Sequence, residues 1–407
     1  MATMTGVSSE IGRLRTVVVH RPGIEISRIT PDNSEALLFD DVLWLERAQE
    51  EHDRFTGILR SRGVEVLYLR DLLGETLADD TVRGAVIDRI VSPAVAGERV
   101  AARLDAALRE CPMEELLDVL MGGVLSFELP HWGIDALFAG LAADRFSMVI
   151  RALPNLLFMR DNSAWINDGV VLGVLASPAR RPESILLETV YRNHPRFGDL
   201  PVWYGDRPDD HYPASIEGGD VLVLDEHTVL VGSGERTSPA AVEALARRLF
   251  AAGTVKRVVV AHFRRDRAVM HLDTVFTMVG TDVVNAFPQV LDDMDVYVLE
   301  PGGTGLRVTS EDGLVPALRR LLPVDDITVV TTGGTAVTQI REQWDDGNNT
   351  VAIEPGVVVA YARNTETNAR LRDAGIEVLE LDASELCRGR GGSRCMTQPV
   401  WRDPVEW

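Results

Sequence analysis

A repeated strand–turn–strand pattern constrains the fold of this chain more than any other feature of its sequence. Each copy opens with a polar cluster, enters a short apolar strand, turns at Asp, Asn, Gly or Pro, and returns through a β-branched strand, which is typical of hairpins. Copies occur at 160–173, 217–232, 271–284 and 345–360. A strand at 16–19 together with the segment around Cys395 would supply a closing copy.

Helices are expected after some of these hairpins. Residues 239–250 carry Ala, Val and Leu at helical spacing behind an N-cap candidate, Ser238, and residues 365–374 form a similar stretch. Each helix leads into a further strand, at 257–260 and 377–381. A hairpin, a helix and a strand that recur along the chain favour modules arranged radially. Strand–helix alternation is equally typical of a doubly wound sheet, and periodicity leaves both folds open.

One region lacks the hairpin pattern. Residues 72–149 are rich in Ala, Leu, Arg and Glu, and the stretches 100–109 and 113–120 predict amphipathic helices that Pro112 separates. We expect this region to be an inserted α-helical subdomain. The catalytic α/β part would then comprise residues 1–71 and 150–407.

Charge and cysteine content limit the class of protein. A formal net charge of -21 over 407 residues argues against a nucleic-acid surface or an anionic membrane, and suits a small cationic substrate. Three cysteines are no disulfide framework, which indicates a reducing compartment. The first 12 residues do not read as a secretory signal, and no apolar run approaches the roughly 18 residues that span a bilayer. We therefore expect a soluble, cytoplasmic protein.

The segment around Cys395 predicts a nucleophile. The cysteine follows the glycine pair at 391–392 and lies near Arg390 and Arg394, whose positive charges favour the reactive thiolate. An arginine-rich tail with an inert cysteine would have the same local sequence. The acidic residues and the histidine upstream favour a catalytic cysteine.

Polar residues that open the other hairpins form a set suited to acid–base chemistry. If the repeats are equivalent, these openings lie at one end of the structure, where nucleophilic attack with proton transfer becomes feasible and a cation is favoured. The set comprises Asp161, Glu217, Asp220, His271, Asp273 and Cys395. Asp220 of this set and several further polar residues are more simply interpreted as turn residues that cap local backbone. These are Asp220, Asp345, Asp346, Asn348 and Asn349.

At these residues the chain resembles the arginine deiminases, which belong to the guanidino-modifying pentein superfamily. The resemblance runs in order along almost the whole chain, so that the set of motifs is far more specific than any single one. The motifs are NLLFMRD at 155–161, EGGD at 217–220, SGERTS at 233–238, MHLDT at 270–274, EQWDDGNN at 342–349 and GGSRCM at 391–396.

The resemblance implies a five-module ββαβ propeller that hydrolyses L-arginine to L-citrulline and ammonia without a metal or other cofactor. It implies that Cys395 attacks the guanidinium carbon, that His271 transfers protons, and that Glu217 orients this histidine. Asp161 and Asp273 would grip the guanidinium nitrogens. The residues expected to bind the rest of the substrate are Asn155 and Phe158, which line the pocket, and Arg180, Arg236 and Arg390, which hold the carboxylate.

Two departures from the family pattern affect this expectation. Met159 stands where relatives commonly carry Thr, and Pro182 interrupts a stretch that is usually charged, where it could shift Arg180.

A homo-oligomer is expected, with no nucleic acid or membrane as partner.

Alternative functions remain open from the sequence. The chain could bind a guanidino compound without turnover, transfer an amidino group, or deiminate a modified arginine in a biosynthetic pathway. It could also be a metal-dependent hydrolase whose ligands are His271, Asp273, Glu217 and Asp220.

Overall fold

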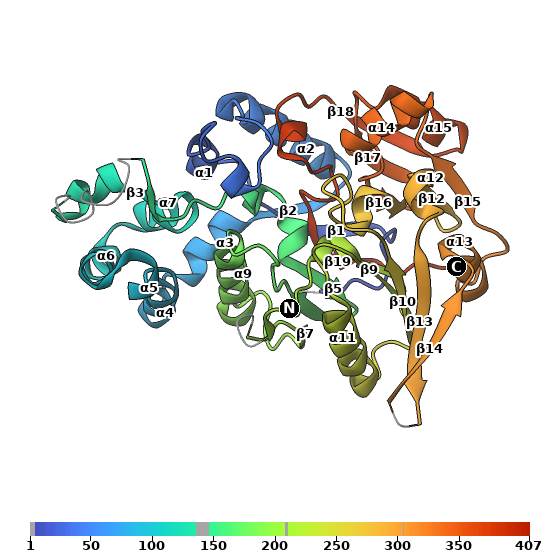
Figure 1. The fold of residues 1–407 in the computed structure, drawn as a ribbon, viewed down its shortest axis with the longest axis horizontal. Helices are drawn as coiled ribbons and strands as arrows, with labels where there is room; N and C mark the ends of the chain where they lie inside the picture. Colours follow the sequence, from blue (N-terminus) through green and yellow to red (C-terminus); the bar gives the residue numbers. More distant parts are fainter. Residues whose placement is uncertain (1–4, 136–145, 208–210, 304) are drawn as a thin grey trace.

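The chain folds into several small sheets and the helices that cover them. In a computed structural model, the described residues are 5–135, 146–207, 211–303 and 305–407. Figure 1 shows the sheets gathered in one part of the molecule, with a group of helices extending away from them on one side. Among the described residues, none of the helices has the length and apolar character of a membrane-spanning segment.

Five three-stranded units among the described residues share one topology. In each unit a first strand pairs antiparallel with a second, and the second pairs parallel with a third that follows a helix. This is the arrangement that a hairpin followed by a right-handed crossover produces. Two units are β5 (Ser163–Ile166), β6 (Gly169–Leu172), α9 (Arg181–Asn193) and β7 (Val202–Tyr204), and β8 (Val221–Asp225), β9 (Thr228–Ser233), α11 (Pro239–Ala252) and β10 (Arg257–His262).

The remaining units include the predicted closing copy, in which the two ends of the chain meet. Strand β1 pairs antiparallel with β19 and parallel with β2, so the N-terminal strand and the segment after Cys395 belong to one sheet. The elements are β11 (Phe276–Met278), β12 (Val283–Ala286), α13 (Leu314–Leu321) and β15 (Thr328–Thr331); β16 (Val351–Glu354), β17 (Val357–Tyr361), α15 (Thr365–Asp373) and β18 (Glu377–Leu381); and β19 (Gln398–Arg402), β1 (Leu14–Val19), α2 (Leu45–Ser61) and β2 (Glu65–Tyr68).

The predicted hairpins and the helices that follow them are therefore confirmed. Separate small sheets take the place of the single sheet that a doubly wound fold requires. The predicted N-cap is also present, since the Ser238 side chain accepts a hydrogen bond from the backbone N–H of Ala241.

A long hairpin was not predicted. Strands β13 (Asp295–Gly302) and β14 (Gly305–Glu311) follow β12 and the short helix α12 (Pro288–Leu291), but they extend the sheet of the preceding unit to the order β14-β13-β10-β9-β8. Figure 1 shows this hairpin projecting from the body of the molecule. Helix α14 (Ala336–Trp344) then leads into the fourth unit.

The helix-rich region contains the two predicted helices, each slightly longer than expected, with Pro112 as the N-cap residue of the second. Its elements are α3 (Leu69–Thr76), α4 (Asp80–Ile90), α5 (Pro93–Ala96), α6 (Glu98–Glu110), α7 (Met113–Gly122), β3 (Val124–Leu125), η2 (Ser126–Trp132) and β4 (Met148–Ile150). Leu104 and Leu116 from these helices share one buried cluster with Val170 of β6 and Leu187 of α9. Whether 72–149 is a separate subdomain stays a prediction, and part of it lies outside the described residues.

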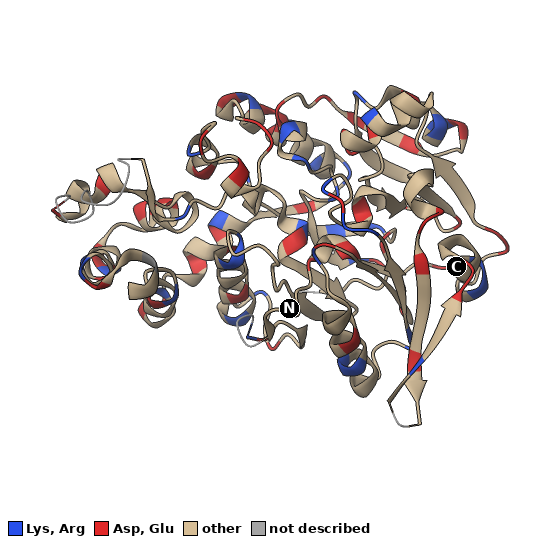
Figure 2. Ribbon diagram, in the orientation of Figure 1, with Lys and Arg blue, Asp and Glu red and all other residues tan. Residues whose placement is uncertain are grey.

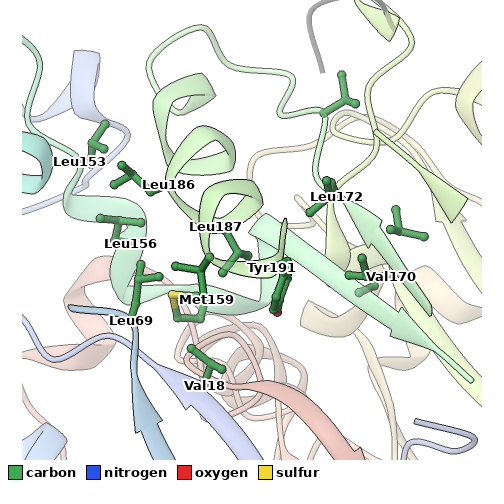
Figure 3. Close-up of a cluster of buried hydrophobic side chains, with 14 of the residues drawn as sticks. Val18, Leu69, Leu153, Leu156, Met159, Val170, Leu172, Leu186, Leu187 and Tyr191 are labelled. Atoms are coloured by element: carbon green, nitrogen blue, oxygen red, sulfur yellow. The ribbon is translucent and has the colours of Figure 1, made fainter. Parts of the chain in front are cut away.

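Met159 belongs to this same apolar cluster. Figure 3 shows its side chain among those of Val18, Leu69 and Tyr191, and it is fully buried. The methionine therefore fills the core behind the polar residues of its segment, which explains how an apolar residue is accommodated there.

Short 3-10 turns position the polar residues that open the hairpins. Turn η4 (Met159–Asn162) precedes β5, η5 (Gly218–Asp220) precedes β8, and η6 (Leu272–Thr274) precedes β11. Neighbouring turns contact each other, η4 with η5 and η5 with η6. The repeat thus brings equivalent openings together, as expected from the sequence. Further short elements are α1 (Ile24–Ser27), η1 (Glu35–Leu37), η3 (Pro154–Leu157) and η7 (Leu386–Gly389).

Candidate active site

The five residues predicted to be catalytic lie in one buried cluster. Glu217 and Asp273 are fully buried, and the other three are 4% exposed. Glycine at 219 is required for this arrangement, because a Cβ there would lie 2.8 Å from Cγ of His271 and 3.0 Å from Oδ1 of Asp161. Charged residues of both signs are buried here, Arg394, Asp273 and Glu217 among them. Figure 2 shows that others are spread along the helices and strands of the whole molecule.

The thiol of Cys395 is held by an asparagine for which the sequence predicts only a turn. Asn349 Nδ2 donates to the Cys395 sulfur at 3.1 Å, and Asn349 Oδ1 accepts from the Cys395 backbone N–H at 3.0 Å. Asp273 Oδ2 lies 3.8 Å from the same sulfur. We had interpreted Asn349 as a turn residue, yet both ends of its amide fix the cysteine.

The thiol is neutral in the empty site. Burial raises its pKa well above the usual value, and the negative charges of Asp273 and Asp161 raise it further. Arg394 opposes this shift, but its guanidinium is already bound by two carboxylates. The arginines near Cys395 therefore do not produce a thiolate by themselves.

His271 is an imidazolium in this environment. Its Nε2 lies 2.7 Å from Glu217 Oε2 and its Nδ1 lies 3.6 Å from Asp161 Oδ1. Burial by itself lowers the pKa of His271, but these carboxylates outweigh it and raise the pKa to about 10. For Glu217, burial favours the neutral form, and the charge and hydrogen bond of His271 reverse this and lower its pKa. His271, stabilised by Glu217, therefore carries a proton that it can transfer.

A second buried ion pair orients Asp273. Arg394 Nη1 donates to Asp273 Oδ2 at 2.6 Å, and its Nε donates to Glu10 Oε2 at 2.9 Å. Burial would raise the pKa of Glu10, but the charge of Arg394 lowers it to about 2. Because Glu10 lies at the opposite end of the chain from Arg394, only the closed fold reveals this contact.

Arg180 is fully engaged with acidic side chains. Its Nη1 donates to Asp161 Oδ2 at 2.7 Å, it forms a 2.9 Å ion pair with Glu183, and its Nη2 donates to the backbone oxygen of Asn155 at 3.3 Å. Pro182 occupies the first turn of α9, where proline is tolerated, and Arg180 remains buried beside the cluster. In the empty site this arginine therefore supports Asp161.

Arg236 and Arg390 retain more of their donors. Arg236 forms an ion pair with Glu235 at 3.2 Å and donates to the sulfur of Met270 at 3.5 Å. The guanidinium of Arg390 lies 3.3 Å from the ring centroid of Trp344. Within the described chain, two buried nitrogens of Arg390, Nε and Nη1, make no hydrogen bond.

The two residues predicted to line the pocket, Asn155 and Phe158, both contact the segment 37–39. Asn155 Nδ2 donates to the backbone oxygen of Leu37 at 2.7 Å, and the Phe158 ring stacks on Phe39 with centroids 6.2 Å apart. A Cβ at position 391 would lie 2.3 Å from Phe158, so the glycine allows the cysteine segment to pack against this ring.

The four residues considered as metal ligands come together only in part. Among the described residues, Asp161, Glu217 and His271 offer ligand atoms within 4.8 Å of one another. The Oδ1 of Asp220 instead accepts the backbone N–H of Leu272 at 2.8 Å, which fits its interpretation as a residue that caps local backbone. A metal ion would also have to displace the proton on His271, whose pKa of about 10 disfavours this step.

Comparison with known proteins places this chain in a family. A family model described as arginine deiminase matches residues 35–402. The arginine deiminase of Rhodococcus opacus is 46% identical over 401 residues, which cover 98% of both chains. That of Mycobacterium tuberculosis is 44% identical over 410 residues and the full length of both. This chain belongs to the arginine deiminase family.

Two solved structures with the same fold are more distant in sequence than these relatives. The amidinotransferase SxtG of Microseira wollei superimposes with a TM-score of 0.60 at 11% identity, over 98% of each chain. The N-terminal domain of ArgZ, a cyanobacterial arginine dihydrolase bound to its product, gives a TM-score of 0.54 at 12% identity, over 95% of this chain and 97% of that one. At these identities the likeness shows the fold alone, so the assignment to the arginine deiminase family rests on the sequence relatives.

Proposed function

We propose that this protein hydrolyses L-arginine to L-citrulline and ammonia through a covalent intermediate on Cys395. One observation carries the proposal. Asp161 and Asp273 each have one carboxylate oxygen bound by a buried arginine, while their Oδ1 atoms are buried without a hydrogen-bond partner among the described residues. Two free acceptors close to a thiol match the paired N–H groups of a guanidinium.

The substrate supplies the charge that the thiol lacks. A guanidinium bound by the two aspartates brings a positive charge next to Cys395 and favours transfer of the thiol proton to solvent water. The sulfur then attacks the central guanidinium carbon. His271, which is protonated, gives its proton to one terminal nitrogen, and ammonia leaves as its carbon–nitrogen bond breaks.

Water completes the reaction. After it has lost its proton, His271 accepts a proton from a water molecule as the water attacks the amidino carbon bound to sulfur. The carbon–sulfur bond breaks, the remaining proton of the added hydroxyl group passes to the sulfur and restores the thiol, and the new carbon–oxygen bond becomes the carbonyl of the ureido group of citrulline. Glu217 stabilises the imidazolium in both steps through its 2.7 Å contact.

We also infer the finer architecture and context from the family and the repeat. The five units would surround a common axis as a ββαβ propeller, with residues 72–149 as an inserted helical subdomain. The net charge of -21 supports a small cationic substrate and disfavours nucleic acid. A homo-oligomer in the cytoplasm remains a prediction.

Product analysis with L-arginine tests the proposal. Citrulline and ammonia in equal amounts are expected from the wild type and not from Cys395→Ala. Cys111→Ala is the matched control, because this cysteine lies in the helix-rich region as the C-cap residue of α6. Ornithine as the main product, or transfer of the amidino group to an added amine, would contradict hydrolysis to citrulline.

A further inference from the structure

One buried carboxylate next to the site has no role in the chemistry above. Asp346 is 4% exposed, and its Oδ2 makes no hydrogen bond to any described residue. A buried acceptor without a partner is unfavourable unless a ligand supplies one. This residue lies in the stretch that we had interpreted as a structural turn.

The backbone at Asp346 is also in an uncommon conformation. Its φ is 60°, in the left-handed region that non-glycine residues adopt uncommonly. The backbone oxygen of Asp346 accepts the N–H of Asn349 at 3.0 Å, so the turn that carries the aspartate also carries the residue that holds the thiol. The strained turn therefore connects Asp346 rigidly to Cys395.

Arg390 lies near this carboxylate but is not bonded to it. The two charges interact, and Asp346 also acts on the Cys395 thiol. Yet the carboxylate that approaches Arg390 is that of Asp40, at 3.6 Å. Trp344, two residues before Asp346, stacks on the Arg390 guanidinium at 3.3 Å. Two buried nitrogens of Arg390 and Oδ2 of Asp346, which make no hydrogen bond to a described residue, therefore lie at the same turn.

Asp346 and Arg390 are complementary in charge to the two groups on the α-carbon of an amino acid. The α-carbon of arginine carries a carboxylate and an ammonium group, which need a cation and an anion at neighbouring positions. We propose that Asp346 binds the α-ammonium group of the substrate while Arg390 binds its α-carboxylate. The assignment rests on the proposed function, and it makes Asp346 a determinant of specificity for a free amino acid.

Charge supports this role. Burial raises the pKa of Asp346 to about 7, although Arg390 lowers it in part. An ammonium group bound beside it would favour the ionised carboxylate and would remove the cost of an unpaired buried group.

Binding to Asp346→Asn in a Cys395→Ala background tests the proposal, because no turnover complicates the measurement. The ligands are L-arginine, 5-guanidinopentanoate, which lacks only the ammonium group, and agmatine, which lacks only the carboxylate. Titration calorimetry should show L-arginine and agmatine weakened on the order of 10- to 100-fold, as for loss of one charged hydrogen bond. The affinity for 5-guanidinopentanoate should be unchanged.

Two further variants separate binding from folding. Asp346→Gly should lose the same preference for the ammonium group while its melting temperature is at least that of the parent, because glycine relieves the positive φ. Asp345→Asn is the matched control, since this neighbour is paired with Arg363 at 3.3 Å, and it should change no affinity.

The outcomes distinguish this inference from the proposed function. If Asp346→Asn weakens L-arginine and 5-guanidinopentanoate equally, then Asp346 only supports Arg390, and the inference is wrong. Unchanged L-arginine affinity overturns it as well. If the parent Cys395→Ala protein binds no guanidino compound, the proposed function fails and the inference fails with it.

Discussion

The recognition of the substrate carboxylate gives a quantitative prediction. The structure leaves Arg236 and Arg390 with uncommitted donors, whereas Arg180 is bound by Asp161 and Glu183. A hydrogen bond to a charged group contributes about 1.5–3 kcal/mol. Agmatine, which lacks the carboxylate, loses at least two such contacts, or about 3–5 kcal/mol. Its kcat/KM should therefore be roughly 10²–10⁴ lower than that of L-arginine.

The three arginines should respond differently in the same assay of citrulline or carbamoylputrescine formation. Arg236→Ala and Arg390→Ala should lower kcat/KM for L-arginine about 10- to 100-fold and leave that for agmatine nearly unchanged. Arg180→Ala should lower both, because it removes the support of Asp161. Arg388→Ala, with an exposed side chain paired to Asp41, is the control. Comparable kcat/KM for the two substrates in the wild type would refute this reasoning.

Three further predictions concern the thiol and its supports. Because the buried thiol favours its neutral form, its alkylation by iodoacetamide should be slow at pH 7 and become faster only at alkaline pH. A cationic haloacetamidine should react fast at pH 7. Equal pH profiles with a low apparent pKa for both reagents would contradict substrate assistance. Asn349→Ala should lower kcat/KM by about 10-fold or more, through loss of roughly 1–3 kcal/mol of hydrogen bonding to Cys395, and an unchanged value would show that the contact is incidental. The pKa of Glu10 falls from 4.5 to about 2 on folding, so its ion pair contributes about 3 kcal/mol above pH 4.5, and that stability is lost as the pH falls toward 2. Urea unfolding of Glu10→Gln should show a large loss at pH 7 and a smaller one at pH 3, and a pH-independent difference would exclude this linkage.

The repeat explains which parts of the fold were predictable. Hairpin turns and helical spacing are local signals, and each copy repeats them, so strands such as β8 and β9 and the helix α11 followed from the sequence. The equivalence of the copies also predicted that their polar openings converge. The hairpin of β13 and β14 was missed because it pairs with a strand of the preceding unit, a choice that depends on tertiary packing.

The supports of the site were less predictable than its reactive groups. Cys395 and His271 stand in motifs whose chemistry is recognisable from residue type. Glu10 and Asn349 act through contacts with segments far away in sequence, and no local pattern marks such contacts. The role of Arg180 at the substrate carboxylate stays a prediction, while its contacts with Asp161 and Glu183 depend on the tertiary fold.

The central claim is that Cys395 carries the substrate during turnover. The most direct measurement is mass spectrometry of the enzyme, quenched in acid during steady-state turnover of L-arginine. We predict that the peptide containing Cys395 carries a mass equal to arginine minus ammonia, and that the peptides containing Cys111 and Cys387 are unmodified. Citrulline formation without this adduct, together with citrulline formation by Cys395→Ala, would contradict the account.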